Sequence, residues 1–421
     1  MKESVLHIAA HLGGGAGKAI SGLAIGMNQY VDSKVILLEE PEQDRYVKAC
    51  KEHGIDVVVS RDANVIKDMV GSADYVIFSW WGHPLSVEVF KVLCQIETRV
   101  FLWSHINGLH YPHISPEFVR VFDGALFTSK CTYENSSWNI EDRKKIEDSS
   151  AIVYGMGDFT PRDIIAKEIY NESSEYKIGY SGTVSYSKMH KDFPKICGEI
   201  LKRIPTATFY IYGKYDEEIY NAFMQYDSNV AERIRFEGYV ENLEAKLTEF
   251  DVYCYPLNAN NFATTENAIL EAMAAGLPVV VLDNPAERNI IEHKVDGLIA
   301  DSPETMVEYV VGIVSDASLA ESLGKNARAS TISKYDSKIN ALNCVHYIRG
   351  YSHAEKKKHD FISLVGEGAG HNFLYFSSMT FDEYAEKKVN GELEAIFMNE
   401  TKGSIKHYLK YYNDDILTNL N

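Results

Sequence analysis

The sequence lacks the features that would direct it to a membrane interior, to nucleic acid or to a disulfide framework. It has no run of the roughly eighteen apolar residues that a membrane span needs, and no apolar signal region near its first residues. The formal net charge is -18, whereas nucleic-acid binding relies on an excess of lysine and arginine. Its six cysteines are far apart and include no C-x-x-C pair, which indicates free thiols rather than a zinc site or disulfides. We therefore expect a cytoplasmic protein with no nucleic-acid partner and at most peripheral membrane contact.

Short apolar runs recur along most of the 421 residues, which are too many for one hydrophobic core. Amphipathic segments separate the runs, a pattern typical of parallel sheets with helices on both faces. We predict an α/β fold with two Rossmann-like domains, residues 1–160 and 161–351, and a partly helical extension over residues 352–421 with an irregular "LVGEGAGHNFLYFSS". Ligands bind at the carboxyl ends of parallel strands, so two facing sheets would hold a ligand in the cleft between them.

A glycine-rich loop, "HLGGGAGK", follows the first predicted strand and precedes a predicted helix. This context suits phosphate binding by backbone N–H groups at a helix N-terminus. The P-loop pattern nevertheless fails, because Leu12 replaces its first glycine and Ala19 replaces the hydroxyl residue that would hold magnesium. The dinucleotide pattern fails too, because Lys18 stands at its third glycine.

The most informative segment is "NNFATTENAILEAMAAGLPVVVLDN". Thr264 or Thr265 is expected to cap a helix that has Glu266 in its first turn and ends at Gly276. Such a helix start, emerging from a strand-end loop, suits a diphosphate. The carboxylate of Glu271, further along the helix, can accept hydrogen bonds from vicinal hydroxyls.

The run "ENAILEAMAAGLPVVVLD" resembles the donor-binding segment of the GT4-type glycosyltransferases, which are retaining enzymes of the GT-B fold. The resemblance extends in order over roughly residues 4 to 350 and includes "GGG" in the first loop, "LWSHI", "GYSGTVSYSKMHKDF" and "DVYCYPL". It implies a GT-B fold with an acceptor-side N-terminal domain and a nucleotide-sugar-binding C-terminal domain. Two family residues are absent: Ala263 stands in place of the first glutamate of the family pair, and Thr183 in place of an arginine.

The resemblance assigns roles to individual residues. His105, Lys188 and Glu271 become the candidate catalytic residues, with Glu271 on the ribose, Lys188 on the diphosphate and His105 near the donor sugar. The other candidate donor-binding residues are Gly13, Gly14, Gly15, Thr183, His190, Thr264, Thr265, Glu266 and Asn267. On the acceptor side we expect Trp81, His83, Trp103 and Tyr111, with the two residues Trp103 and Tyr111 able to stack on a sugar.

The implied reaction moves a sugar from a nucleotide-diphosphate sugar to a hydroxyl of a sugar, glycan, lipid-linked or protein acceptor, with retention and without cofactor or metal. Surface polysaccharide synthesis is a common task of such enzymes. Two alternatives remain open: a nucleotide-sugar epimerase, and a binding or scaffold subunit that has lost catalysis. The extension either crosses back onto the N-terminal domain or provides an oligomer surface.

Overall fold

The protein divides into two compact units in the computed structural model, which describes residues 2–168, 170, 175–186, 188–240, 242–398 and 403–421. Unit 1 comprises residues 1–159, 262–264 and 337–421, and unit 2 comprises residues 160–261 and 265–336. Residues 337–351, which the sequence analysis assigns to the second domain, thus belong with the first. Residues 399–402 of the extension lie outside the described residues.

Unit 1 is built on a seven-stranded sheet with the order β3-β2-β1-β4-β5-β6-β7, and all its strands run parallel. Its strands are β1 (Ser4–Ala9), β2 (Asp32–Leu37), β3 (Asp56–Val59), β4 (Tyr75–Trp80), β5 (Val100–Ser104), β6 (Gly124–Phe127) and β7 (Ser150–Ile152). The connecting helices are α1 (Gly14–Met27), α2 (Arg45–Glu52), α3 (Ala63–Ser72), α4 (Ser86–Leu93), α5 (Pro116–Val121), a 3-10 turn (Lys130–Glu134) and α6 (Ile140–Asp148).

Both faces of this sheet are buried, because its side chains alternate between two apolar clusters. Along β1, Leu6 and Ile8 belong to one cluster, and Val5 and Ala9 belong to the other. Helix α1 packs against α2 and against α15 (Ser337–Arg349) on the second face. A Cβ at Gly22 of α1 would lie 2.2 Å from the backbone carbon of Gly157, so this close approach requires glycine.

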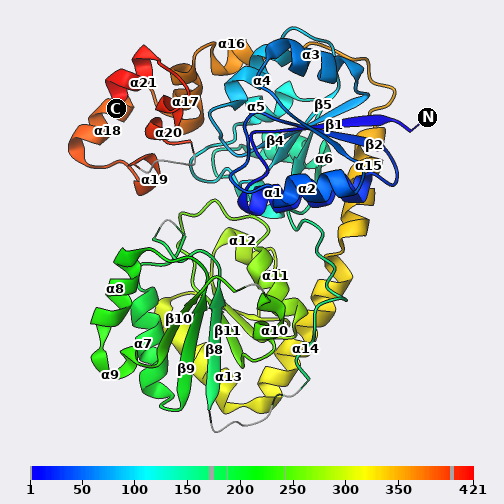
Figure 1. Ribbon diagram of the computed structural model, residues 1–421. Coiled ribbons are helices and arrows are strands. Elements are labelled where there is room, and N and C mark those ends of the chain that lie inside the picture. Colours follow the sequence, from blue (N-terminus) through cyan, green and yellow to red (C-terminus); the bar gives the residue numbers. More distant parts are fainter. Residues whose placement is uncertain (1, 169, 171–174, 187, 241, 399–402) are drawn as a thin grey trace. The chain divides into compact units, whose positions relative to one another are not determined.

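The C-terminal extension is part of unit 1 and covers the other face of the sheet. Its helices are α16 (Phe361–Val365), α17 (Ala369–Ser377), α18 (Phe381–Asn390), α19 (Ala395–Met398), α20 (Ile405–Leu409) and α21 (Asp415–Leu420). The stretch that the sequence analysis describes as irregular, residues 364–378, contains the end of α16 and the whole of α17. Figure 1 shows α17 to α21, in orange and red, gathered in one group beside the strands of unit 1. Phe376 of α17 packs on Trp80 and Phe118, with ring centroids 4.8 and 4.9 Å apart.

Unit 2 is built on a six-stranded parallel sheet with the order β10-β9-β8-β11-β12-β13. Its strands are β8 (Tyr176–Ser181), β9 (Ala207–Tyr212), β10 (Ile234–Gly238), β11 (Val252–Tyr255), β12 (Val279–Leu282) and β13 (Leu298–Ala300). Its helices are α7 (Phe193–Arg203), α8 (Glu217–Tyr226), α9 (Ser228–Ala231), α10 (Leu243–Leu247), α11 (Asn267–Ala274), α12 (Pro285–Arg288), α13 (Pro303–Ser315) and α14 (Ala317–Lys334).

The predicted fold class, two Rossmann-like parallel α/β units with a helical C-terminal region, is confirmed. Each strand except β7 overlaps one of the short apolar runs of the sequence. Among the described residues, no helix combines the length and apolar character needed to cross a bilayer.

Candidate functional site

In unit 2, the loops that follow β8 and β11 lie against each other at the carboxyl edge of the sheet. Met189 and Leu257 form an antiparallel bridge, and the Asn258 amide donates to the Lys188 carbonyl at 2.9 Å. The two strands are neighbours, so their carboxyl ends meet at one place. The contact between the two loops brings the loop that carries Lys188 to the start of α11.

An ion pair marks the meeting point. The Lys188 Nζ lies 3.0 Å from Glu266 Oε2, which also accepts a 2.6 Å hydrogen bond from the Tyr255 hydroxyl. Burial raises the pKa of Glu266, but the charge of Lys188 and the two hydrogen bonds outweigh burial and hold the pKa below its usual range. Glu266 is therefore ionised at neutral pH, and it balances the charge of Lys188.

The start of α11 differs from the expectation. The helix begins at Asn267 with Glu266 as its N-cap residue, and the Glu266 side chain makes no cap hydrogen bond. Thr264 and Thr265 are therefore not the cap, and Glu266 is not in the first turn. The reason is that the Glu266 side chain turns to Lys188 and Tyr255 instead of the helix amides. Thr264 is grouped with unit 1, where Asn107 donates to the Phe262 and Ala263 carbonyls at 3.4 and 3.0 Å.

The remaining candidates of unit 2 lie on the same edge. Thr183 is exposed in the loop after β8, and its carbonyl accepts from the Tyr180 hydroxyl at 2.9 Å. His190 is half-buried, and burial lowers its pKa. Glu271 is partly buried on α11 and lies close enough to Tyr253 for its charge to raise the pKa of that phenol, a smaller effect than burial.

Sequence reasoning missed Glu287 in α12. Its side chain is fully buried, Oε1 accepts from Asn284 Nδ2 at 2.9 Å, and Oε2 has no partner among the described residues. Burial raises the pKa of Glu287 to about 7, and the nearby charge of Glu266 adds to this effect. A carboxyl group next to the ion pair can thus carry a proton at neutral pH. The only signal in the sequence is "NPAER" at the end of a strand.

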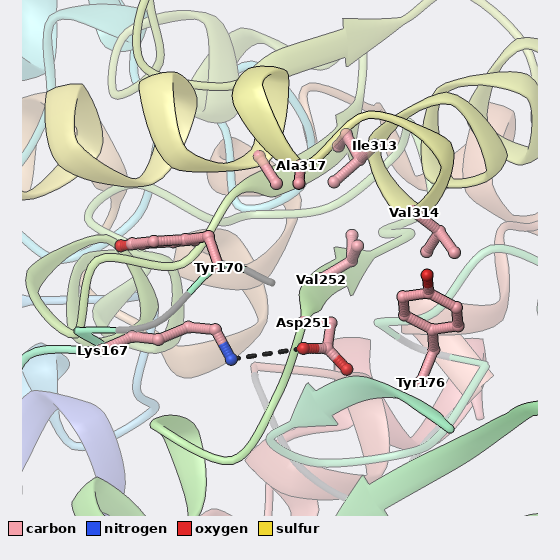
Figure 2. Close-up of a pocket in the computed structure, with 9 residues that line it drawn as sticks. Lys167, Tyr170, Tyr176, Asp251, Val252, Ile313, Val314 and Ala317 are labelled. Carbon is pink, nitrogen blue, oxygen red and sulfur yellow. Dashed lines mark hydrogen bonds and ion pairs between the residues drawn. The ribbon is translucent and has the colours of Figure 1, made fainter. Parts of the chain in front are cut away.

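A separate hollow lies at the opposite edge of the unit 2 sheet (Figure 2). Tyr176 begins β8 there, and Asp251 directly precedes β11. Two of its lining residues, Lys167 and Asp251, form an ion pair of 3.2 Å, drawn as a dashed line in Figure 2. Because ligands of parallel sheets bind at the carboxyl edge, this hollow is not the candidate site.

In unit 1, the glycine loop delivers the start of α1 to the carboxyl edge of the sheet. Gly13 is the N-cap residue, and no side chain caps the helix. Gly14 has φ of +57°, and the space around Gly14 and Gly15 is open. The first amides of α1 can therefore approach a ligand, as the sequence predicts for a glycine loop.

His105 follows β5 at the same edge. Its ring centroid lies 4.3 Å from that of Trp103 and 5.8 Å from that of Trp81. The Nε2 atom is buried and has no hydrogen-bond partner among the described residues, and burial lowers the pKa to about 3. A neutral histidine is thus held with one nitrogen unused.

The candidate acceptor residues separate into two groups. Trp81 is partly exposed, and His83 is 4% exposed beside it. Trp103 and Tyr111 are 0% and 1% exposed, so the expectation that they stack on a sugar is wrong. Trp103 donates to the Val153 carbonyl at 3.0 Å, and Tyr111 donates to the Gly403 carbonyl. Both aromatic rings fill the core of unit 1.

A polar cluster that the sequence analysis did not find surrounds His83. We call it the Glu39 cluster; its members are His11, Glu39, His83, His407 and Tyr411. His11 and Glu39 each follow a strand, so the strand-end rule could have found them. Nothing in the sequence pattern connects them to His407 and Tyr411, which come from the extension.

Among the described residues, one group of three could offer ligands to a metal ion, namely His11, Glu39 and His83, with ligand atoms within 4.8 Å of one another. The backbone opposes such a site, because Nδ1 of His11 accepts from the Gly13 amide and Nδ1 of His83 accepts from the Leu85 amide. A metal at Nδ1 would displace these bonds. A metal at Nε2 would require a proton on Nδ1, directed at a backbone N–H. The donor set does not fit a metal ion in this arrangement.

Comparisons with known proteins identify glycosyltransferases as relatives of part of the chain. Residues 175–316 match the family described as "Glycosyl transferases group 1", which confirms a resemblance to glycosyltransferases for that part of the chain. An uncharacterized glycosyltransferase of Methanocaldococcus jannaschii is 29% identical over 168 residues, or 39% of this chain and 42% of that protein. The alpha-monoglucosyldiacylglycerol synthase of Acholeplasma laidlawii is 25% identical over 232 residues, or 50% of this chain and 57% of that protein. The matches thus span about half the length of these curated relatives.

The fold is also that of solved structures. The structure of HepE from Anabaena in complex with UDP superposes with a TM-score of 0.64 and 14% identity, covering 83% of this chain and 100% of that chain. At this identity the likeness concerns the fold alone.

Proposed function

We propose that the protein is a glycosyltransferase that moves a sugar from a nucleoside-diphosphate sugar to an acceptor hydroxyl. The observation that carries the proposal is the convergence of Lys188 with the start of α11 at the carboxyl edge of the unit 2 sheet. This convergence lies within the segment that matches the group 1 glycosyltransferases. A cation beside the first amides of a helix is an arrangement that suits a diphosphate.

In the proposed reaction, unit 2 binds the nucleoside diphosphate. The ammonium group of Lys188 has three N–H donors, so it can contact a phosphate oxygen while it keeps its bond to Glu266. Lys188 and the α11 amides then stabilise the charge that develops on the leaving diphosphate. Glu271 accepts hydrogen bonds from the ribose hydroxyls. Glu287 in its protonated form adds a neutral neighbour, which does not repel the phosphates.

Unit 1 provides groups for sugar hydroxyls. His105 has a buried ring nitrogen with no hydrogen-bond partner among the described residues, and the space around Gly14 and Gly15 is open to a ligand. We further propose that transfer retains the anomeric configuration and needs no metal ion, as the resemblance implies. A cytoplasmic role in glycan or surface polysaccharide synthesis completes the proposal.

Thermal unfolding in the presence of UDP, GDP, ADP, CMP or inorganic phosphate, each without metal, tests this function. A ligand at about a hundred times its Kd stabilises the folded state by about 2.7 kcal/mol, so one nucleoside diphosphate should raise the melting temperature by several degrees. Phosphate alone should not, because it lacks the groups that Glu271 binds. If none of the nucleotides raises the melting temperature, the transferase proposal fails and a non-catalytic scaffold is favoured.

A further inference from the structure

The Glu39 cluster joins the sheet edge of unit 1 to the C-terminal extension. His11, Glu39 and His83 follow β1, β2 and β4, which are adjacent strands. The carboxylate of Glu39 lies 3.3 Å from His83 Nε2 through one oxygen and accepts a 2.7 Å hydrogen bond from Tyr411 through the other. The His407 ring packs edge-on against His83, with centroids 4.7 Å apart.

The backbone determines where each imidazole of the cluster carries its proton. Nδ1 of His11, His83 and His407 accepts the amide of Gly13, Leu85 and Gly403, respectively, at 3.0 to 3.2 Å. Each neutral ring therefore has its hydrogen on Nε2. The cluster thus combines one carboxylate acceptor with N–H and O–H donors.

Glu39 remains ionised in this setting. Burial raises its pKa, but the hydrogen bonds from His83 and Tyr411 outweigh burial and lower the pKa to about 2. The Glu39 side chain is 25% exposed, and the neighbouring His11 and Trp81 are also partly exposed. The His11 and Trp81 rings meet edge to face at 5.4 Å. A ligand can therefore reach a carboxylate, an imidazole and an indole together.

We propose that Glu39, His11 and Trp81 form the acceptor subsite of unit 1, for an uncharged sugar ring, with Tyr411 as a positioning residue. This inference rests on the proposed transferase function. A sugar hydroxyl donates to Glu39 and accepts from an imidazole N–H, while the C–H face of the ring packs on the indole. The fixed negative charge of Glu39 disfavours uronic acids and phosphorylated sugars.

The extension holds Tyr411 in place through its own anchors. The Gly403 carbonyl accepts from Tyr111, and the Gly403 amide donates to His407, one turn before Tyr411. A Cβ at Gly403 would lie 2.6 Å from the Gly82 carbonyl oxygen. The buried Tyr111 therefore acts on the subsite indirectly, by fixing the segment that orients Glu39.

Saturation-transfer NMR on the full chain tests the subsite with methyl α-glucoside, methyl α-galactoside, N-acetylglucosamine and glucuronic acid as probes. We expect at least one neutral sugar to bind and glucuronic acid not to bind. Glu39→Gln should weaken sugar binding by about tenfold, because it removes a charged acceptor, and Tyr411→Phe should weaken it by about threefold. Tyr412→Phe is the matched control, since the Tyr412 hydroxyl donates to the Pro84 carbonyl at 3.3 Å.

A positioning role also predicts which kinetic constant changes. Tyr411→Phe should raise KM for the acceptor sugar and leave KM for the donor unchanged, and its melting temperature should match that of Tyr412→Phe. Equal sugar affinity in wild type and Glu39→Gln would overturn the subsite, as would a wild-type chain that binds none of the neutral sugars. Stabilisation by Zn²⁺ that Glu39→Gln abolishes would also overturn it, in favour of a metal centre. Sugar binding is measured without nucleotide, so this experiment tests the subsite alone. The thermal-unfolding experiment with nucleotides tests the transferase proposal separately.

Discussion

Lys188 and Glu266 form a balanced pair in the folded protein, although the sequence pattern presents Lys188 as a free diphosphate ligand. The pair is only partly accessible, with side-chain exposures of 25% and 13%. The Tyr255 hydroxyl donates a hydrogen bond to the Glu266 oxygen that faces Lys188. The Lys188 ammonium group lies over the Tyr255 ring, 5.4 Å from the ring centroid. The electrostatic attraction of Lys188 for a phosphate is therefore reduced by its own partner.

Two substitutions distinguish the effects of Lys188 and Glu266 on nucleotide binding. Lys188→Gln keeps an amide that can donate to Glu266 but removes the charge, so affinity for the stabilising nucleoside diphosphate should fall about tenfold. Glu266→Gln leaves the Lys188 charge for the ligand, so affinity should rise about threefold. Isothermal titration calorimetry measures both.

Lys177→Ala is the matched control, because Lys177 pairs with Glu249 at the exposed opposite end of β8. If Lys188→Gln and Lys177→Ala bind the nucleoside diphosphate with equal affinity, Lys188 is not part of the donor site. Weaker binding by Glu266→Gln would mean that Glu266 itself contacts the ligand.

At the scale of elements, β1 carries a histidine in its interior. His7 is 0% exposed, and both ring nitrogens lack a hydrogen-bond partner among the described residues. Burial lowers its pKa to about 4, from an ordinary value of 6.5. The unfolded chain thus takes up a proton as the pH falls through 6.5, while the folded protein resists until about pH 4, so stability is lost over this window.

His7→Leu should remove this loss of stability. The wild-type protein should lose roughly 1 kcal/mol through His7 between about pH 8 and pH 5.5, and the leucine variant should lose that much less. Chemical unfolding at the two pH values measures the difference. His353→Leu, at an exposed position, is the control, and an acid dependence in His7→Leu equal to that of His353→Leu would contradict the argument.

For the whole molecule, the C-terminal extension decides whether unit 1 has a complete core. Phe361 stacks on Phe90 with centroids 4.8 Å apart, and Phe373, Phe376 and Tyr408 of the extension belong to the same apolar cluster as the sheet. This placement agrees with an extension that crosses back onto the first domain. An oligomer surface is not needed to explain its apolar residues.

Truncation after residue 350 should therefore leave unit 1 unable to fold. Each buried phenylalanine contributes about 1.5 to 3 kcal/mol, and a domain is stable by only about 5 to 15 kcal/mol. Solubility and far-UV circular dichroism of the truncated chain check this. A milder variant, Phe376→Ala, should cost about 3 to 5 kcal/mol. A soluble truncated chain with the wild-type melting temperature would contradict the prediction.

The sequence alone predicted most of the fold because strand and helix patterns are local. The apolar runs gave every strand of the unit 2 sheet and six of the seven strands of the unit 1 sheet. It missed β7, an edge strand whose three residues begin with a serine and are all only partly buried, so that no apolar run marks it. The glycine loop was equally readable, because Gly14 has a φ of +57°, a backbone conformation that favours glycine.

Tertiary structure decided the roles of individual side chains, because burial and pairing depend on residues far apart in the chain. Trp103 and Tyr111 have the residue type of a sugar platform, yet the sheet and the extension bury them. Glu266 has the residue type of a helix-start carboxylate, yet Lys188 attracts it away from the helix. One hydrogen-bond partner of Glu39 is Tyr411, 372 residues later, and no spacing rule reaches that distance. The sequence by itself therefore determined the two parallel sheets and their binding edges, while only the folded chain decided which side chains meet there.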